Sequence, residues 1–360
     1  MNLNEDERRQ YSRHLLLNEV GEEGQLKLKK AKVLVIGAGG LSTPVLQYLT
    51  AAGVGRIGVI DDDVVDETNL QRQVLFTQQD KGKLKVESVV QKLKQLNPFI
   101  QFDVHKERLS KENVLNIFEP YEIIVDGTDN FPTRYLINDA AVLLDKIVVF
   151  GSIFKFDGQV SVFNYKNGPT YRCLYPTPPN PDAVPNCSDV GVLGILPGII
   201  GSFQTNEVLK IILGIGEVLS GKLLQFDALS MRQTMLSFKK NPTIQIIELS
   251  DDYQEFCGLI HIAELDFDEF KTYASNYHVL DVRTTKEYHE FSIPSLNIPL
   301  DELAERLSEI PTNKKLLVVC KSGMRSRKAI QLLTQTSIDF ELYSLKGGLD
   351  SIKSYHQIQQ

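Results

Sequence analysis

A glycine turn and an acidic residue near the start of the chain have the spacing that phosphate and ribose binding require. The apolar run 33–36 leads into the turn, and an apolar helical pattern over 44–52 follows it. The glycines of the turn are Gly37, Gly39 and Gly40. They allow a tight turn and a close approach to a phosphate, whose charge meets the free N–H groups of the helix start. A second apolar run, 57–60, ends at Asp61, where a carboxylate can hold a ribose hydroxyl. The pattern predicts a nucleotide-binding unit, although Ser42 replaces the third glycine of the usual motif.

A second group of polar residues could hold a triphosphate and a metal ion. Its members are Asn69, Gln71, Arg72, Lys85, Asp129 and Asn130. The cations and amides suit phosphates, and the carboxylate of Asp129 suits Mg²⁺. A hydride-transfer enzyme would need a nicotinamide pocket and a base instead, so this group favours attack on an α-phosphate. Simpler interpretations exist, because Asp129 and Asn130 could cap a helix that starts at Phe131, and single Lys or Arg side chains are usually solvated.

A cysteine near the end of the chain has the surroundings of a nucleophile. Cys320 follows the apolar run 316–319 and is followed by Gly323, Arg325 and a helical pattern. A thiol placed there is favoured as a thiolate, and the loop can cradle an anion. Because the loop between Cys320 and Arg325 is one residue shorter than in cysteine phosphatases, it favours sulfur over phosphate. The alternative is a buried structural cysteine.

The elements that would position these residues form two α/β patterns. Strands and helices alternate through the first pattern, which predicts a mainly parallel sheet, and the strand 123–126 ends where such a sheet places its ligand crevice. After Gly151 the apolar period becomes two, which indicates an antiparallel extension. The second pattern is smaller, with helices expected near 301–310 and 327–333. The expected organisation is a Rossmann-like ATP-binding domain over 1–240, a linker over 241–258 and a smaller α/β domain over 259–360.

Composition excludes several functional classes. The 360 residues are 42% hydrophobic, which is enough for ordinary cores, and the net charge of -7 argues against a nucleic-acid surface. The longest apolar runs are too short for a membrane span and no leader-like segment opens the chain, so we expect a cytoplasmic protein without membrane contact. The four cysteines form no C-x-x-C pair, which indicates free thiols.

Over residues 5–240 the chain resembles the MoeB/ThiF family of ubiquitin-activating-type adenylyltransferases. The motifs that carry the resemblance are Tyr11-Ser12-Arg13-His14, Gly37-Ala38-Gly39-Gly40, Asn69-Leu70-Gln71-Arg72-Gln73, Gly82-Lys83-Leu84-Lys85, Asp126-Gly127-Thr128-Asp129-Asn130 and Tyr171-Arg172-Cys173-Leu174. The resemblance implies ATP-dependent adenylation of the C-terminal glycine of a small ubiquitin-like sulfur carrier that ends in Gly-Gly.

The same resemblance assigns roles to individual residues. The residues implied to hold ATP are Gly40, Asp61, Asn69, Arg72, Lys85, Asp129 and Asn130. Asp129 would also hold Mg²⁺. Arg13 would reach into the neighbouring subunit's site, as in the family's homodimers, unless it is merely a surface charge.

Residues 259–360 resemble a rhodanese domain. The residues that carry this resemblance are the 316–326 loop with Leu280-Asp281-Val282-Arg283, Glu287-Tyr288, Ile293-Pro294, Asn297-Ile298-Pro299-Leu300 and Lys346-Gly347-Gly348. In rhodaneses the cysteine, here Cys320, carries a persulfide. The implied sulfur donor is a cysteine desulfurase or thiosulfate.

Two further cysteines bear on the expected chemistry. Cys187 ends a stretch rich in proline, and its match to the adenylyltransferase family implies the thiol that links covalently to the activated carrier. Many family members hold Zn²⁺ with two C-x-x-C pairs, but here Thr170 stands where the first cysteine would be, Cys173 is alone, and 243–246 contains no cysteine. We therefore expect no zinc site.

Three other functions compete with this interpretation. The first is an activator that passes a ubiquitin-like protein from Cys187 as a thioester for conjugation. The intact Cys320 loop disfavours this function. The second is a docking module with a degenerate nucleotide site, which the complete set of cations and carboxylates disfavours. The third is an NAD oxidoreductase, which would bind nicotinamide and show no pyrophosphate exchange.

Overall fold

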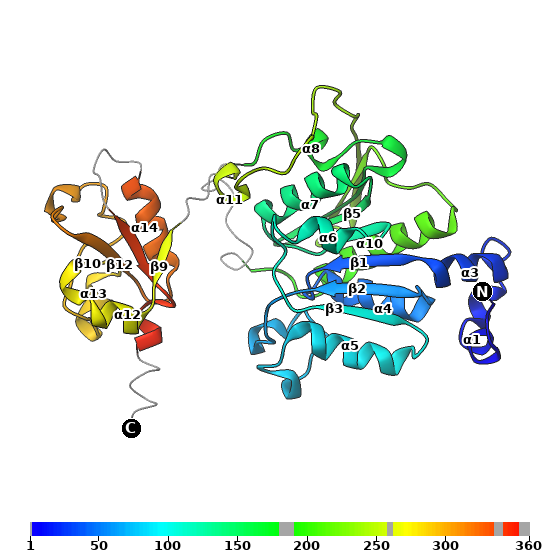
Figure 1. Cartoon of the computed structure of the whole chain (residues 1–360), viewed down its shortest axis with the longest axis horizontal. Helices are drawn as coiled ribbons and strands as arrows, with labels where there is room; N and C mark the ends of the chain where they lie inside the picture. Colours follow the sequence, from blue (N-terminus) through cyan, green and yellow to red (C-terminus); the bar gives the residue numbers. More distant parts are fainter. Residues whose placement is uncertain (1, 180–190, 258–261, 335–340, 353–360) are drawn as a thin grey trace. The chain divides into compact units, whose positions relative to one another are not determined.

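The structure, a computed structural model, describes residues 2–179, 191–257, 262–334 and 341–352. The chain divides into two compact units, Met1–Gly258 and Leu259–Gln360. Figure 1 colours them along the sequence. In the described ranges no helix is both long enough and apolar enough to cross a membrane.

The first unit is built on an eight-stranded sheet. In spatial order its strands are β3 (Gln101–His105), β2 (Arg56–Ile60), β1 (Lys32–Ile36), β4 (Ile123–Asp126), β5 (Ile147–Phe154), β6 (Asp157–Phe163), β7 (Lys222–Asp227) and β8 (Arg232–Ser237). Neighbours from β3 to β5 run parallel, and those from β5 to β8 run antiparallel. The predicted mainly parallel sheet with an antiparallel extension is confirmed.

Helices pack on this sheet through its alternating apolar residues. The helices in the described residues of the first unit are α1 (Glu5–Gln10), α2 (Ser12–Leu15), α3 (Gly21–Lys30), α4 (Ser42–Ala52), α5 (Lys85–Leu96), α6 (Val114–Phe118), α7 (Phe131–Leu143), α8 (Tyr171–Leu174), α10 (Leu196–Leu213) and α11 (Tyr253–Phe256). Val33 and Val35 of β1 share one buried cluster with Leu46 of α4 and Val89 of α5. Because successive strand residues point to opposite faces, this alternation places α4 and α5 on one face of the sheet.

The stretch expected to be a linker contributes a helix that packs on the first unit. The phenol of Tyr253, in α11, donates a hydrogen bond of 2.9 Å to Asp139 of α7. The guanidinium of Arg172 donates two hydrogen bonds of 2.7 Å to the same carboxylate. The Arg172 guanidinium also lies 4.5 Å from the ring centre of Phe256. These contacts attach residues 253–257 to the first unit, ahead of the boundary at Gly258.

The second unit is a smaller sheet whose neighbouring strands all run parallel. In spatial order they are β11 (Leu296–Asn297), β10 (Tyr277–Asp281), β12 (Lys315–Val319), β13 (Leu342–Leu345) and β9 (Ala263–Leu265). Its helices are α12 (Phe267–Thr272), α13 (Thr285–Glu290) and α14 (Met324–Thr334). The helix expected over 301–310 is wrong, because that stretch forms turns and a short 3₁₀ segment at Leu307–Glu309. Its backbone bonds span three residues, as from Glu305 N–H to the Glu302 carbonyl.

Candidate active sites

The register of the first sheet brings three chain turns to one edge. Ile36 of β1 lies level with Ile60 of β2 and with Asp126 of β4. The residues that follow these three positions therefore leave the sheet side by side. Gly37 begins the first turn with a φ of +87°, and a Cβ there would lie 3.2 Å from the Gly127 carbonyl oxygen. Only glycine accepts this conformation readily at so close an approach.

Asp61 is held in place by the backbone of the glycine turn and of its own turn. Its carboxylate accepts hydrogen bonds from the N–H of Ala38, at 2.7 Å, and from the N–H of Asp63, at 2.8 Å. Burial raises the pKa of Asp61, while these bonds and the charge of Lys85 act in the opposite direction. The carboxylate is thus fixed between the glycine turn and the end of β2, where a ribose hydroxyl could reach it.

The turns enclose a cavity of about 410 Å³. The predicted cofactor-binding residues that line it are Gly37, Gly39, Gly40, Asp61, Asn69, Arg72, Lys85, Asp129 and Asn130. Gln71 is the predicted residue outside the lining. Its side chain lies against Gly194, where a Cβ would come within 2.3 Å of the Gln71 Oε1 atom. The structure therefore brings together all of the predicted set except Gln71.

Two cations of the predicted set lie on the cavity wall. Lys85 is the first residue of α5 and only 6% of its surface is exposed. Its ammonium group lies 2.7 Å from the carboxylate of Asp63. The positive end of the helix dipole and burial both disfavour a lysine at this position. An anionic ligand in the cavity could offset both effects. Arg72 donates a hydrogen bond of 3.0 Å to the Thr68 carbonyl.

The polar end of β4 has both a structural and a potential binding role. The Asn130 side chain accepts a hydrogen bond of 3.0 Å from the Thr133 N–H and so caps α7, as the simpler interpretation proposed. Asp126 is buried and accepts two hydrogen bonds from Thr128, and burial raises its pKa. Asp129, in contrast, is exposed at the cavity wall. Its carboxylate is therefore available to a cation bound with phosphate.

Sequence reasoning missed several residues of the cavity wall. Arg108 lies in the loop after β3, whose His105 is level with Ile60 of β2, so strand order could have indicated it. Gln73 was noted only as part of a motif. It is 5% exposed, and its Oε1 atom has no hydrogen-bond partner among the described residues. A buried polar atom without a partner on a cavity wall is the kind of group that a polar ligand satisfies.

One acidic cluster in the described ranges could hold a metal ion. It consists of Asp61, Asp62 and Asp63, and all three residues line the cavity. The predicted magnesium ligand Asp129 lies on the same wall but is not part of this cluster. Oxygen ligands suit Mg²⁺, so the donor set of the cavity fits a magnesium-bound triphosphate.

Arg13 lies away from the cavity of its own chain. It is an exposed residue of α2 and is not among the residues that line the cavity. Leu16 and Leu17, which follow it closely, are 72% and 51% exposed. Exposed leucines beside an exposed arginine are consistent with a surface that another protein covers.

The second candidate site surrounds Cys320 at the end of β12. Its sulfur is buried and accepts a hydrogen bond of 3.2 Å from the Gly323 N–H. Gly323 has a φ of +97°, which turns the chain around the sulfur just before α14 begins at Met324. Ser326 supports the loop by donating a hydrogen bond of 2.9 Å to the Gly323 carbonyl. The predicted nucleophile thus lies in a backbone loop at a helix start.

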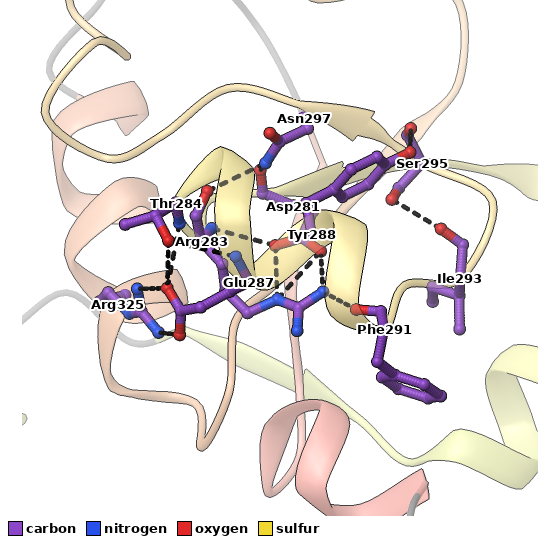
Figure 2. Close-up of polar contacts among 10 residues, drawn as sticks. All are labelled: Asp281, Arg283, Thr284, Glu287, Tyr288, Phe291, Ile293, Ser295, Asn297 and Arg325. Carbon is purple, nitrogen blue, oxygen red and sulfur yellow. Dashed lines mark hydrogen bonds and ion pairs between the residues drawn. The ribbon is translucent and has the colours of Figure 1, made fainter.

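An ion pair connects this loop to the neighbouring strand end. Figure 2 shows the Arg325 guanidinium facing the Glu287 carboxylate, with both terminal nitrogens 2.7 Å from its oxygens. The pairing is possible because Asp281 of β10 lies level with Val319 of β12. The hydrogen bonds from Arg325 are the main reason that the pKa of Glu287 falls to about 2.

The remaining cysteines lie in different surroundings. Cys173 accepts hydrogen bonds of 3.4 Å from the N–H groups of Thr170 and Asn241. Cys257 is buried after α11, and burial raises its pKa to about 11. The predicted catalytic Cys187 lies outside the described residues.

Sequence comparisons identify relatives of both units. The model of the ThiF family matches residues 11–246, and that of the rhodanese-like domain matches residues 266–355. A sulfur carrier protein adenylyltransferase of Thermus thermophilus is 49% identical over 72% of this chain and the whole of that protein. The adenylyltransferase and sulfurtransferase MOCS3 of Anopheles gambiae is 42% identical over 92% of this chain and 82% of its own length. The probable adenylyltransferase/sulfurtransferase MoeZ of Mycobacterium tuberculosis is 40% identical over 96% of this chain and 93% of its own length.

Solved structures match the first part of the chain in fold. The crystal structure of Escherichia coli MccB with MccA-N7isoASN has a TM-score of 0.60 and 21% identity, over 67% of this chain and 75% of that one. The structure of the same protein with ATP has a TM-score of 0.58 and 22% identity, over 68% and 75%. At this identity the match is one of architecture.

Proposed function

Because the chain belongs to the ThiF family and continues into a rhodanese-like domain, we propose that it is an adenylyltransferase and sulfurtransferase acting on a sulfur carrier. The carrier is a small ubiquitin-like protein ending in Gly-Gly, whose terminal carboxylate becomes a thiocarboxylate. The observation that carries the proposal is the single cavity that gathers the glycine turn with Asp61, Arg72, Lys85 and Asp129. The names of the relatives, which include sulfur carrier protein adenylyltransferase, support it.

The first step of the proposed reaction is adenylation. A carboxylate oxygen of the carrier's last glycine attacks the α-phosphorus of ATP, and pyrophosphate leaves with the electron pair of the broken P–O bond. Lys85 and Arg72 stabilise the charge that develops on the phosphates, and Asp61 holds the ribose. Asp129 would hold Mg²⁺, which supplies further neutralisation of phosphate charge when it is bound. The product is a mixed anhydride of the carrier with AMP.

The second step is sulfur transfer. A donor, either thiosulfate or the persulfide of a cysteine desulfurase, leaves a sulfur atom on Cys320. The terminal sulfur of this persulfide attacks the carrier's acyl carbon, and AMP leaves. The carrier is then joined to Cys320 through an acyl disulfide. The thiolate of Cys187 attacks the Cys320 sulfur, the carrier leaves as a thiocarboxylate, and a cellular thiol reduces the resulting disulfide.

The active form is proposed to be a homodimer in which Arg13 enters the partner's adenylation site. Two observations support this arrangement, namely the exposure of Arg13 away from its own cavity and the exposed Leu16 and Leu17 beside it. The use of ATP and of reduced thiols suits a cytoplasmic location.

Pyrophosphate exchange tests the adenylation step. The enzyme is mixed with ATP, labelled pyrophosphate and the Gly-Gly carrier, and label entering ATP is measured. We expect exchange that requires the carrier and is lost in Asp129→Ala, because that variant removes the carboxylate proposed to bind the metal. A carrier without its last glycine is the matched control and should support no exchange. Exchange at the wild-type rate in Asp129→Ala, or without carrier, would contradict the proposal.

A further inference from the structure

The guanidinium of Arg325, in the Cys320 loop, already forms an ion pair with a carboxylate of the same unit, that of Glu287. Arg325 gives both terminal nitrogens to Glu287 at 2.7 Å, which is the geometry of a bidentate ion pair. The two side chains are 32% and 30% exposed, so they lie at the mouth of the loop rather than in the core. An incoming anion therefore meets a neutral pair instead of a free guanidinium.

Glu287 is fixed on its other side as well. It accepts hydrogen bonds from the Thr284 N–H, at 3.1 Å, and from the Thr284 hydroxyl, at 2.9 Å. The first of these bonds, with the one that the Glu287 N–H donates to the Thr284 hydroxyl oxygen at 3.3 Å, forms the capping box of α13. Glu287 has a pKa of about 2, which keeps it charged at physiological pH. The carboxylate cannot readily turn away when a substrate arrives, because leaving Arg325 would also break its two bonds from Thr284.

The base of α13 is rigid for a separate reason. Figure 2 shows the Arg283 guanidinium facing the Asp281 carboxylate, and both residues are buried. The Asn297 amide donates hydrogen bonds to the carbonyls of Asp281, at 2.9 Å, and Arg283, at 3.0 Å. This buried network holds the chain that carries Glu287 against the sheet edge where Cys320 emerges.

We propose that Glu287 determines donor specificity in the sulfurtransferase site by neutralising Arg325 and so disfavouring small dianionic donors such as thiosulfate. Donors that bring less negative charge to the loop, such as a persulfide, are then relatively favoured. The inference rests on the proposed function, in which Cys320 accepts the sulfur. Lys321 is exposed in the same loop, and its charge is screened by solvent, so it replaces Arg325 only weakly.

The reaction that would reveal this preference is sulfur transfer to cyanide. The Cys320 thiolate attacks the outer sulfur of thiosulfate, the S–S bond breaks, and sulfite leaves with the electron pair. Cyanide then takes the terminal sulfur of the persulfide, leaving as thiocyanate and restoring the thiolate. An aryl thiosulfonate reacts in the same way with release of a sulfinate, but it carries one negative charge instead of two.

The test compares the two donors in the full chain and in Glu287→Gln. Glutamine keeps the shape of the side chain and removes its charge. We expect kcat/KM for thiosulfate to rise about tenfold, mainly through KM, because one repelling charge is removed from the partly exposed mouth of the loop. Repulsion scales with the charge of the donor, so the gain with the thiosulfonate should be about threefold. A capping role alone would change thermal stability but not this ratio between donors.

Control variants separate the possible failures. Glu290 is an exposed glutamate at the end of the same helix. In Glu290→Gln, kcat/KM should stay near the wild-type value for both donors. Transfer that persists in Cys320→Ser would refute the proposed sulfurtransferase function. Transfer that depends on Cys320, with an unchanged donor ratio, a lower kcat/KM or no thiosulfate activity in Glu287→Gln, would overturn the inference about Glu287 alone.

Discussion

Replacing Lys85 by alanine should remove most of the adenylation activity while leaving the fold intact. The Lys85 side chain is only 7% exposed, and it lies on the cavity wall at the first turn of α5. Its nearest charged neighbour in the described structure, Asp63, is 67% exposed and so strongly hydrated. Most of the field of Lys85 is therefore available to a phosphate in the cavity.

The size of the effect follows from Coulomb's law. Two unit charges about 4 Å apart interact by about 4 kcal/mol at an effective dielectric constant near 20. The negative charge of Asp63 cancels part of this attraction between Lys85 and the phosphate. We therefore expect Lys85→Ala to lose about 3 kcal/mol of transition-state stabilisation, which corresponds to about a hundredfold decrease in kcat/KM. Stability should change by less than about 1 kcal/mol, because the pair is with an exposed partner and lysine opposes the helix dipole there.

The assay is carrier-dependent pyrophosphate exchange, with thermal unfolding measured in parallel. Lys83→Ala is the matched control, because Lys83 is close in sequence but its side chain is 57% exposed and 4.0 Å from Asp80. This control should retain wild-type exchange. Exchange in Lys85→Ala within threefold of wild type, or an equal loss in Lys83→Ala, would refute the assignment of Lys85 to the phosphates.

Three further predictions concern the thiols, the dimer and zinc. Cys320→Ser should keep pyrophosphate exchange and lose sulfur transfer from thiosulfate, because only the persulfide loop is altered; loss of exchange would show that the two activities are not separable in this way. Arg13→Ala should lose exchange and recover it when mixed with Lys85→Ala subunits, since each mixed dimer contains one intact site; no recovery would count against a shared site. The purified protein should contain no stoichiometric zinc, because the sequence has no C-x-x-C pair and therefore too few thiols for four ligands, and one zinc per chain by elemental analysis would contradict this.

The parallel strands of the first unit could be predicted well from sequence. Buried parallel strands are continuous apolar runs, and the predicted runs 33–36 and 57–60 fall within β1 and β2. The glycine turn and Asp61 could then be placed at one sheet edge, since carboxyl ends of parallel strands meet there. Arg108 was missed because its loop follows β3, whose place beside β2 depends on strand order rather than on any local motif.

Other features depend on tertiary contacts that no local pattern specifies. The pairing of Glu287 with Arg325 arises because β10 and β12 are neighbours in the sheet. Their paired residues Asp281 and Val319 are more than thirty positions apart in the sequence. The apparent helix over 301–310 has apolar spacing, but its buried residue Leu303 packs in turns against the second sheet. Polar composition suggested a linker before residue 258, whereas Tyr253 secures that stretch to α7 through Asp139.

The most direct test of the whole account is the chemical state of the carrier's C-terminus. The Gly-Gly carrier is incubated with the full chain, ATP, Mg²⁺ and a sulfane sulfur donor, and it is analysed by mass spectrometry without reductant and then with it. We predict a carrier in which one carboxylate oxygen is replaced by sulfur, and in Cys187→Ser a carrier trapped on Cys320 that reductant releases. A carrier never found on Cys320, together with a reductant-resistant thioester at Cys187 in the wild type, would contradict the account and support thioester transfer.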